Sequence, residues 1–254
     1  MVALDIDGTL LDEAGVMPDH IKESVSRVLD AGVPVVLSTG RGWYATEPVF
    51  EALGLPPGPS VCSNGAVLVT YPPFELVEVA TFDPEKVIRH VHALSPNARI
   101  AVEVIGKGFR LNKLFPNGDL AGQMTIETID ELCAEPASRV IVRDPDVASE
   151  EFLTLADDLG MHGVSYAVGW SNWLDIAPEG INKAQGLEKV CAPLGIKAED
   201  VLAIGDGYND IEMLAWAGRG VAMGQAADGV KVHADTVTGT FFEGGTSQEL
   251  RRWF

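Results

Sequence analysis

Two aspartates near the start of the chain are spaced for shared chemistry. Asp5 lies within a short apolar run at residues 2–6, which leads directly into Asp7-Gly8-Thr9. Residues two apart on a strand point to the same side, so both carboxylates would meet where the strand ends. Carboxylates this close repel unless a cation or a shared proton lies between them. A hard cation such as Mg²⁺ is the natural partner, although a DxD pair alone is also common in solvated turns.

A second acidic pair follows another buried strand, predicted at residues 201–204. Asp206 and Asp210 are four residues apart across a turn that opens a helix, so both could reach one ion. A simpler interpretation is that Asp206 or Asn209 caps the helix start. The two interpretations are compatible, because a helix N-terminus also favours anions.

Two further segments offer groups that suit a phosphate. Thr39-Gly40-Arg41 follows the predicted strand 34–38, and a hydroxyl with free backbone N–H groups at such a turn suits phosphate oxygens. Lys183, near the start of a predicted helix, offers a positive charge, although a helical lysine is more often solvated. Residues 40–45 also fit GxGxxA, but they follow the second strand, and no acidic residue about 20 residues on would hold a ribose.

The first third of the chain alternates strands and helices. The expected order is strand 2–6, helix 19–31, strand 34–38, helix 43–53, strand 61–63, a turn at Asn64-Gly65, and two strands within 66–80 around Pro72-Pro73. A βαβαβ order is typical of a parallel, doubly wound sheet.

The middle of the chain has a different pattern. The expected elements are helix 84–94, strands 99–105 and 109–114, helix 127–134, strand 139–143, helix 149–159, and strands 164–168 and 173–176. Neighbouring strand pairs with helices between them predict an α+β layer on an antiparallel sheet. After Pro178 the α/β pattern resumes, with helix 182–194, strand 201–204, helix 209–217, strand 220–223 and helix 246–253. We therefore predict a Rossmann-like α/β core of residues 1–80 and 179–254, interrupted by an inserted α+β domain at 81–178.

Charge and cysteine content exclude several partners. The 254 residues include 37 Asp and Glu against 18 Lys and Arg, a net charge of −19, which argues against nucleic acid or an anionic membrane as partner. Three cysteines without a CxxC pair indicate neither a disulfide framework nor a zinc site, and they favour a reducing compartment. No apolar run reaches the length of about 18 residues that a membrane span needs. We expect a cytoplasmic protein, monomeric or homodimeric.

Taken in order, these segments resemble the haloacid dehalogenase superfamily of phosphohydrolases, in its Cof-type branch (subfamily IIB, with a C2-type cap). The family patterns DxDGTL, TGR, NGA, a lysine after the cap, and GDxxNDxxML have counterparts at residues 5–10, 39–41, 64–66, 183 and 205–214. The resemblance covers essentially the whole chain. One departure is Ala184, where the family often has glycine after the lysine, and this should not affect the ammonium group.

The resemblance implies Mg²⁺-dependent hydrolysis of phosphate monoesters through a phospho-aspartate. Asp5 would be the nucleophile, and Asp7 would protonate the leaving alcohol and then deprotonate water. Thr39 and Lys183 would complete the catalytic set by holding the phosphoryl oxygens. The expected phosphate-binding residues are Gly8, Thr39, Gly40, Asn64, Lys183 and Asn209. The expected metal ligands are Asp5, Asp206 and the backbone carbonyl of Asp7. Asp210 would either coordinate the metal directly or hold one of the residues that do.

The inserted domain would then be the cap that selects the leaving group. A roofed site suits small phosphorylated metabolites, with sugar phosphates first and phosphoglycolate and nucleotide or cofactor phosphates behind them. Polar and aromatic residues available for selection are Trp43, Tyr44, Lys107, Arg110, Asn112, Lys113, Trp170, Asn172 and Trp173. One alternative is a phosphosugar mutase or phosphotransferase. Another is a non-catalytic Mg²⁺ or phosphate sensor resembling response-regulator receivers, which lack an acid/base at the position of Asp7.

Overall fold

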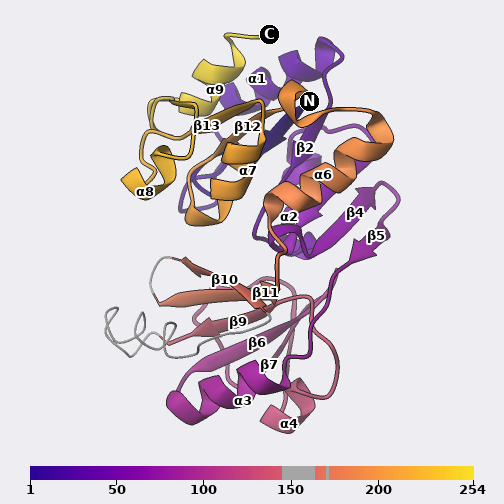
Figure 1. The fold of residues 1–254 in the computed structure, drawn as a ribbon, viewed down its shortest axis with the longest axis vertical. Coiled ribbons are helices and arrows are strands. Elements are labelled where there is room, and N and C mark those ends of the chain that lie inside the picture. Colours follow the sequence, from indigo (N-terminus) through magenta and orange to yellow (C-terminus); the bar gives the residue numbers. More distant parts are fainter. Residues whose placement is uncertain (145–163, 170–171) are drawn as a thin grey trace. The chain divides into compact units, whose positions relative to one another are not determined.

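The computed structural model describes residues 1–144, 164–169 and 172–254, and it consists of two compact units (Figure 1). One unit contains residues 1–41, 46–78 and 182–254, and the other contains residues 42–45 and 79–181. The predicted helix at 149–159 lies outside the described residues. None of the helices that the structure describes is both long enough and apolar enough to cross a membrane.

A parallel sheet of five strands forms the centre of the first unit. Its order is β14 (Thr236–Val237), β13 (Arg219–Ala222), β12 (Leu202–Gly205), β1 (Val2–Leu4), β2 (Val35–Leu37). Ala3 lies opposite Ala203 on one side and Val36 on the other. These strands are apolar at successive positions because both faces of a parallel sheet are covered. The predicted fold class, a doubly wound α/β core with an inserted α+β domain, is confirmed.

Helices cover both faces of this sheet. The main helices around this sheet are α1 (Asp19–Asp30), α2 (Trp43–Ala52, whose first turn is assigned to the second unit), α6 (Lys183–Leu194) and α7 (Ile211–Trp216). The other helices are η1 (Ser63–Gly65), η2 (Ala198–Asp200), η3 (Tyr208–Asp210), α8 (Asp228–Lys231) and α9 (Gly245–Leu250). Leu187 of α6 and Met213 of α7 share one buried cluster with Ala3 and Val36 of the strands. The predicted helices at 19–31, 43–53 and 182–194 are confirmed to within one residue at each end.

The last helix of this unit is fastened by polar side chains. Ser247 of α9 donates a hydrogen bond to the carbonyl of His20, which ties α9 to α1. Glu249 is 1% exposed and accepts hydrogen bonds from Arg219 Nε at 2.7 Å and Trp253 Nε1 at 2.9 Å. Burial alone would raise the pKa of Glu249, but these hydrogen bonds and the arginine charge lower it below its usual value.

The third strand of the predicted βαβαβ order lies in a second sheet rather than in the five-stranded parallel one. β3 (Gly58–Cys62) is antiparallel to β4 (Val67–Tyr71), and β5 (Glu75–Val79) follows in the same three-stranded sheet. A single parallel bridge from Ser38 to Val61 joins this sheet to β2. The expected turns at Asn64-Gly65 and Pro72-Pro73 are confirmed, because they separate β3 from β4 and β4 from β5. The hairpin that follows β3 is the reason that this strand belongs to an antiparallel sheet.

The second unit is built on a six-stranded sheet. Its order is β10 (Val164–Gly169), β11 (Trp173–Pro178), β9 (Val140–Arg143), β6 (Arg99–Val104), β7 (Gly108–Leu111), β8 (Gln123–Ile126). The prediction of an antiparallel sheet holds except at its edge, where β7 and β8 are parallel. The sequence reading missed β8 because most of its side chains are exposed, so it carries no alternating apolar pattern. α3 (Glu85–Leu94) and α4 (Ile129–Leu132) pack on one face of the sheet, with Ile88 and Leu132 in one cluster with Ile100.

Candidate active site

Three carboxylates converge at the carboxyl ends of β1 and β12. Asp5 donates its backbone N–H to the carbonyl of Ile204, which locks the two strand ends together. Oxygen atoms from Asp5, Asp206 and Asp210 lie within 4.8 Å of one another. Asp5 is 5% exposed and Asp210 is fully buried. The structure therefore brings together three of the four acidic residues that the sequence singled out.

A buried lysine neutralises part of this charge. Lys183 Nζ donates to Asp5 Oδ1 at 2.6 Å and to Asp210 Oδ1 at 2.5 Å, and the lysine side chain is inaccessible to solvent. Asn182 caps α6 by accepting the N–H of Gln185, which makes Lys183 the first helical residue. The helix start lies so close to residue 65 that any side chain there would collide with the Asn182 carbonyl, and Gly65 has none. This close contact brings Lys183 to the carboxylates.

Burial and mutual repulsion perturb the pKa values of these groups. Burial and the charge of Asp210 raise the pKa of Asp5 well above its usual value. The same causes, in the same order, raise the pKa of Asp206 to about 6. Burial alone would lower the pKa of Lys183, but the charges of Asp210 and Asp5 outweigh it and raise that pKa. One ammonium therefore does not balance three carboxylates in this environment.

The donor set fits a hard cation. Among the described residues, nothing donates a hydrogen bond to Asp5 Oδ2 or to Asp206 Oδ1, so both oxygens are open to a ligand. Asp210 is different, because its Oδ2 accepts the backbone N–H groups of Asp206 and Gly207 at 2.9 Å each, and its Oδ1 accepts Lys183. Asp210 thus holds the turn that presents Asp206. Carboxylate oxygens are the ligands that Mg²⁺ prefers.

The expected phosphate-binding residues gather beside this cluster. Thr39 donates its N–H to Val61, and its own carbonyl accepts the N–H of Asn64, so the ends of β2 and β3 are joined. Asn64 adopts a left-handed backbone (φ 54°), which asparagine tolerates better than most residues. Its Oδ1 accepts Asn209 Nδ2 at 2.9 Å, and a Cβ at Gly40 would lie beside both amides.

Asp7 lies apart from the three clustered carboxylates. Arg41 donates to both of its oxygens, from Nε at 2.9 Å and from a terminal nitrogen at 2.6 Å. The Asp7 side chain is 61% exposed, in contrast to the burial of Asp5. Gly8 follows with a positive φ of 72°, and a Cβ there would collide with the carboxylate of Asp206. The 7–8 turn therefore carries one exposed carboxylate and passes directly beside the acidic cluster.

Gln225 is a site residue that the sequence reading missed. Its Nε2 donates to the Gly8 carbonyl at 2.7 Å and to Asp206 Oδ2 at 3.2 Å, and its Oε1 accepts the N–H of Phe241 at 2.9 Å. It lies three residues after β13, the strand beside β12. Position at the carboxyl edge of the sheet was the signal available in the sequence.

Several residues considered for substrate selection have structural partners instead. Asn112 accepts the N–H of Ile100 and donates to the Ala98 carbonyl, and Lys113 donates to the Pro96 carbonyl. Arg110 forms an ion pair with Glu127, Asn172 donates to the Asp144 carbonyl, and the ring of Trp173 packs edge-on against Phe115. Trp43 is buried, whereas Tyr44 and Lys107 are exposed. Trp170 lies outside the described residues.

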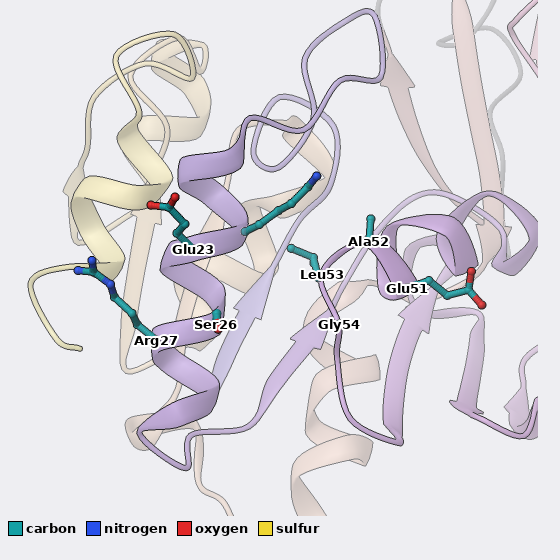
Figure 2. Close-up of a pocket in the computed structure, with 8 residues that line it drawn as sticks. Glu23, Ser26, Arg27, Glu51, Ala52, Leu53 and Gly54 are labelled. Carbon is teal, nitrogen blue, oxygen red and sulfur yellow. The ribbon is translucent and has the colours of Figure 1, made fainter.

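Figure 2 shows a shallow surface pocket elsewhere on the first unit. It is formed by the exposed side of α1 and by the end of α2 with the turn that follows it. The lining residues are Lys22, Glu23, Ser26, Arg27, Glu51, Ala52, Leu53 and Gly54. None of the candidate site residues is among them, and the charged groups are of both signs, so we assign no ligand to this pocket.

Comparisons with known proteins identify the family of this chain. The model of the haloacid dehalogenase-like hydrolase family matches residues 2–250. The pyridoxal phosphate phosphatase of Escherichia coli is 31% identical, over 94% of this chain and 93% of its own. A 5-amino-6-(5-phospho-D-ribitylamino)uracil phosphatase of Bacillus subtilis is 30% identical, over 100% of this chain and 95% of its own. A crystal structure of a haloacid dehalogenase-like hydrolase from Bacteroides thetaiotaomicron superimposes with a TM-score of 0.84, at 25% identity and over 100% and 98% of the two chains. The chain therefore belongs to the haloacid dehalogenase-like hydrolase family, as its motifs indicated, and is a hydrolase of the branch whose named members include these phosphatases.

Proposed function

We propose that this hydrolase cleaves phosphate monoesters of small metabolites with the help of Mg²⁺ and through a phospho-aspartate on Asp5. Sugar phosphates are the first substrate class, and phosphoglycolate is the second. The observation that carries the proposal is the group of three carboxylates, two of them buried and paired with Lys183. The named activities of the two relatives, both on phosphates of small organic molecules, support the substrate class.

The proposed reaction has two steps, transfer of the phosphoryl group to Asp5 and its hydrolysis. An oxygen of Asp5 attacks phosphorus, the ester P–O bond breaks, and Asp7 gives its proton to the departing alkoxide. Water then attacks the phospho-aspartate, Asp7 takes a proton from that water, and the Asp5 carboxylate is released with inorganic phosphate. The two hydrogen bonds from Arg41 hold the Asp7 carboxylate in one orientation while it is ionised. Thr39, Lys183, the amides of Asn64 and Asn209 and the backbone of Gly8 and Gly40 would bind the phosphoryl oxygens.

The bound cation would neutralise charge so that a carboxylate can approach a phosphate dianion. Asp5 and Asp206 would hold it with the backbone carbonyl of Asp7, while Asp210 fixes the 206–207 turn. We assign substrate selection to the second unit and the chemistry to the first. Cys62, Cys133 and Cys191 form no disulfide among the described residues, which supports our placement of the reaction in the cytoplasm.

The test is phosphate release from an aryl phosphate, followed by a panel of sugar phosphates, phosphoglycolate, pyridoxal phosphate and nucleotides. Activity should vanish in EDTA and return with Mg²⁺. Asp5→Asn should abolish it, whereas Asp12→Asn should not, because Asp12 only accepts backbone N–H groups of its own turn. Full activity of metal-free protein would contradict the proposal. Stimulation by a bisphosphorylated sugar would favour the mutase alternative.

A further inference from the structure

One amide side chain connects three segments around the acidic cluster. Gln225 contacts the turn after β1 at Gly8, the turn after β12 at Asp206, and the segment after β14 at Phe241. These segments are far apart in sequence, and each follows a different strand of the parallel sheet. The Gln225 side chain is therefore a cross-link at the carboxyl edge of the sheet.

The partners determine how the amide must be oriented. A backbone N–H can only donate, so the atom that faces Phe241 must be the amide oxygen. The NH₂ group then necessarily faces the Gly8 carbonyl and Asp206 Oδ2, which can only accept. All three contacts are satisfied by this one orientation.

The carboxylate of Asp206 depends on this contact. Among the described residues, Gln225 is the group that donates a hydrogen bond to that carboxylate, and it does so at Oδ2. Asp206 Oδ1 accepts no hydrogen bond from the described residues and is therefore available to a cation. The same NH₂ group holds the carbonyl of Gly8, the residue after Asp7, and the carbonyl of Asp7 itself is a proposed ligand.

We propose that Gln225 is a positioning residue that sets Asp206 and the 7–8 main chain for cation binding. This inference rests on the proposed function, because it requires the cation site at the acidic cluster. Groups that orient metal ligands typically contribute about 10–100-fold to metal affinity. We expect about 10-fold, the low end of that range, because Gln225 is exposed and water competes for its partners.

The test compares Gln225→Met and Gln225→Asn with the matched control Gln248→Met. Gln248 also uses its Nε2 to hold the 240–244 segment, through the Glu243 carbonyl at 2.6 Å, but it touches none of the candidate site residues. Mn²⁺ affinity is measured by electron paramagnetic resonance on the full chain without substrate. The melting temperature in EDTA is measured in parallel.

Both Gln225 variants should bind Mn²⁺ about 10-fold more weakly than the unmodified protein, and Gln248→Met should bind as it does. Excess Mg²⁺ should restore kcat in the Gln225 variants. A lower melting temperature with unchanged Mn²⁺ affinity would show that Gln225 only fastens the 240–244 segment, and would overturn the inference. Absence of Mn²⁺ binding in the unmodified protein would instead overturn the proposed cation site itself, and the inference with it.

Discussion

Replacing Lys183 with methionine should destabilise the first unit severely. Methionine keeps most of the length of the side chain and removes only its charge and its donors. The lysine is fully buried and forms ion pairs with Asp5 and Asp210, which are themselves buried. Removing one partner from a buried ion pair leaves uncompensated charge, at a cost of about 3–5 kcal/mol.

The same helix offers a matched control. Lys189 of α6 forms an ion pair with Glu78, but the two side chains are 38% and 48% exposed. An exposed pair of this kind contributes about 0–1 kcal/mol to the free energy of unfolding. Lys189→Met therefore makes the same chemical change on the same helix as Lys183→Met. The two sites differ mainly in the burial of the lysine and its partners.

The assay is thermal unfolding in EDTA at neutral pH, followed by circular dichroism. In a chain of this size about 1 kcal/mol corresponds to roughly 2–4 °C. The transition of the first unit should fall by roughly 6–20 °C in Lys183→Met and by less than about 4 °C in Lys189→Met. Mg²⁺ should recover part of the loss in Lys183→Met, because a cation can replace the missing charge. Equal shifts in the two variants would refute the argument from burial.

Two further predictions concern other carboxylates. Asp5→Asn should form no phosphoenzyme, while Asp7→Asn should form some from an aryl phosphate but fail to hydrolyse it; mass spectrometry that finds phosphate on another residue would contradict this assignment. Glu249→Gln should lose stability at neutral pH, because the pKa of Glu249 is lowered in the fold and its contribution exists above the unfolded-state pKa. The difference from the unmodified protein in urea midpoint should shrink as the pH falls through the lowered pKa, and a difference independent of pH would argue against an ionic contribution.

Much of the site follows from local sequence patterns. Asp5 and Asp206 each follow an apolar strand of a parallel sheet, and such strands end at the same edge. The placement of Lys183 required more than pattern, because a lysine at the start of a helix is usually solvated. The motif supplied the expectation, and the structure supplies the reason, which is the close approach of Asn182 to Gly65.

The features that the sequence reading missed lack a periodic signal. β8 is largely exposed, so neither face of the strand is marked by apolar residues. Gln225 acts through one amide that joins segments distant in sequence, and its place after β13 is the one local sign of that role. The placement of β3 in a sheet with β4 and β5, apart from the parallel sheet, depends on the turns after β3 and β4 rather than on the residues of β3. Such features are set by tertiary contacts, which a local pattern does not encode.

The net negative charge of the chain makes anion binding depend on the local arrangement of charges around Lys183. With a net charge of −19, the general field of the protein repels an anionic substrate. A phosphate can be bound only where local donors outweigh that field, and the carboxylate cluster works against this unless it is neutralised. Lys183 neutralises part of the cluster, and its burial keeps water from screening that interaction. The remaining negative charge is what a divalent cation would balance, so cation binding, stability and phosphate binding should all change together when Lys183 is replaced.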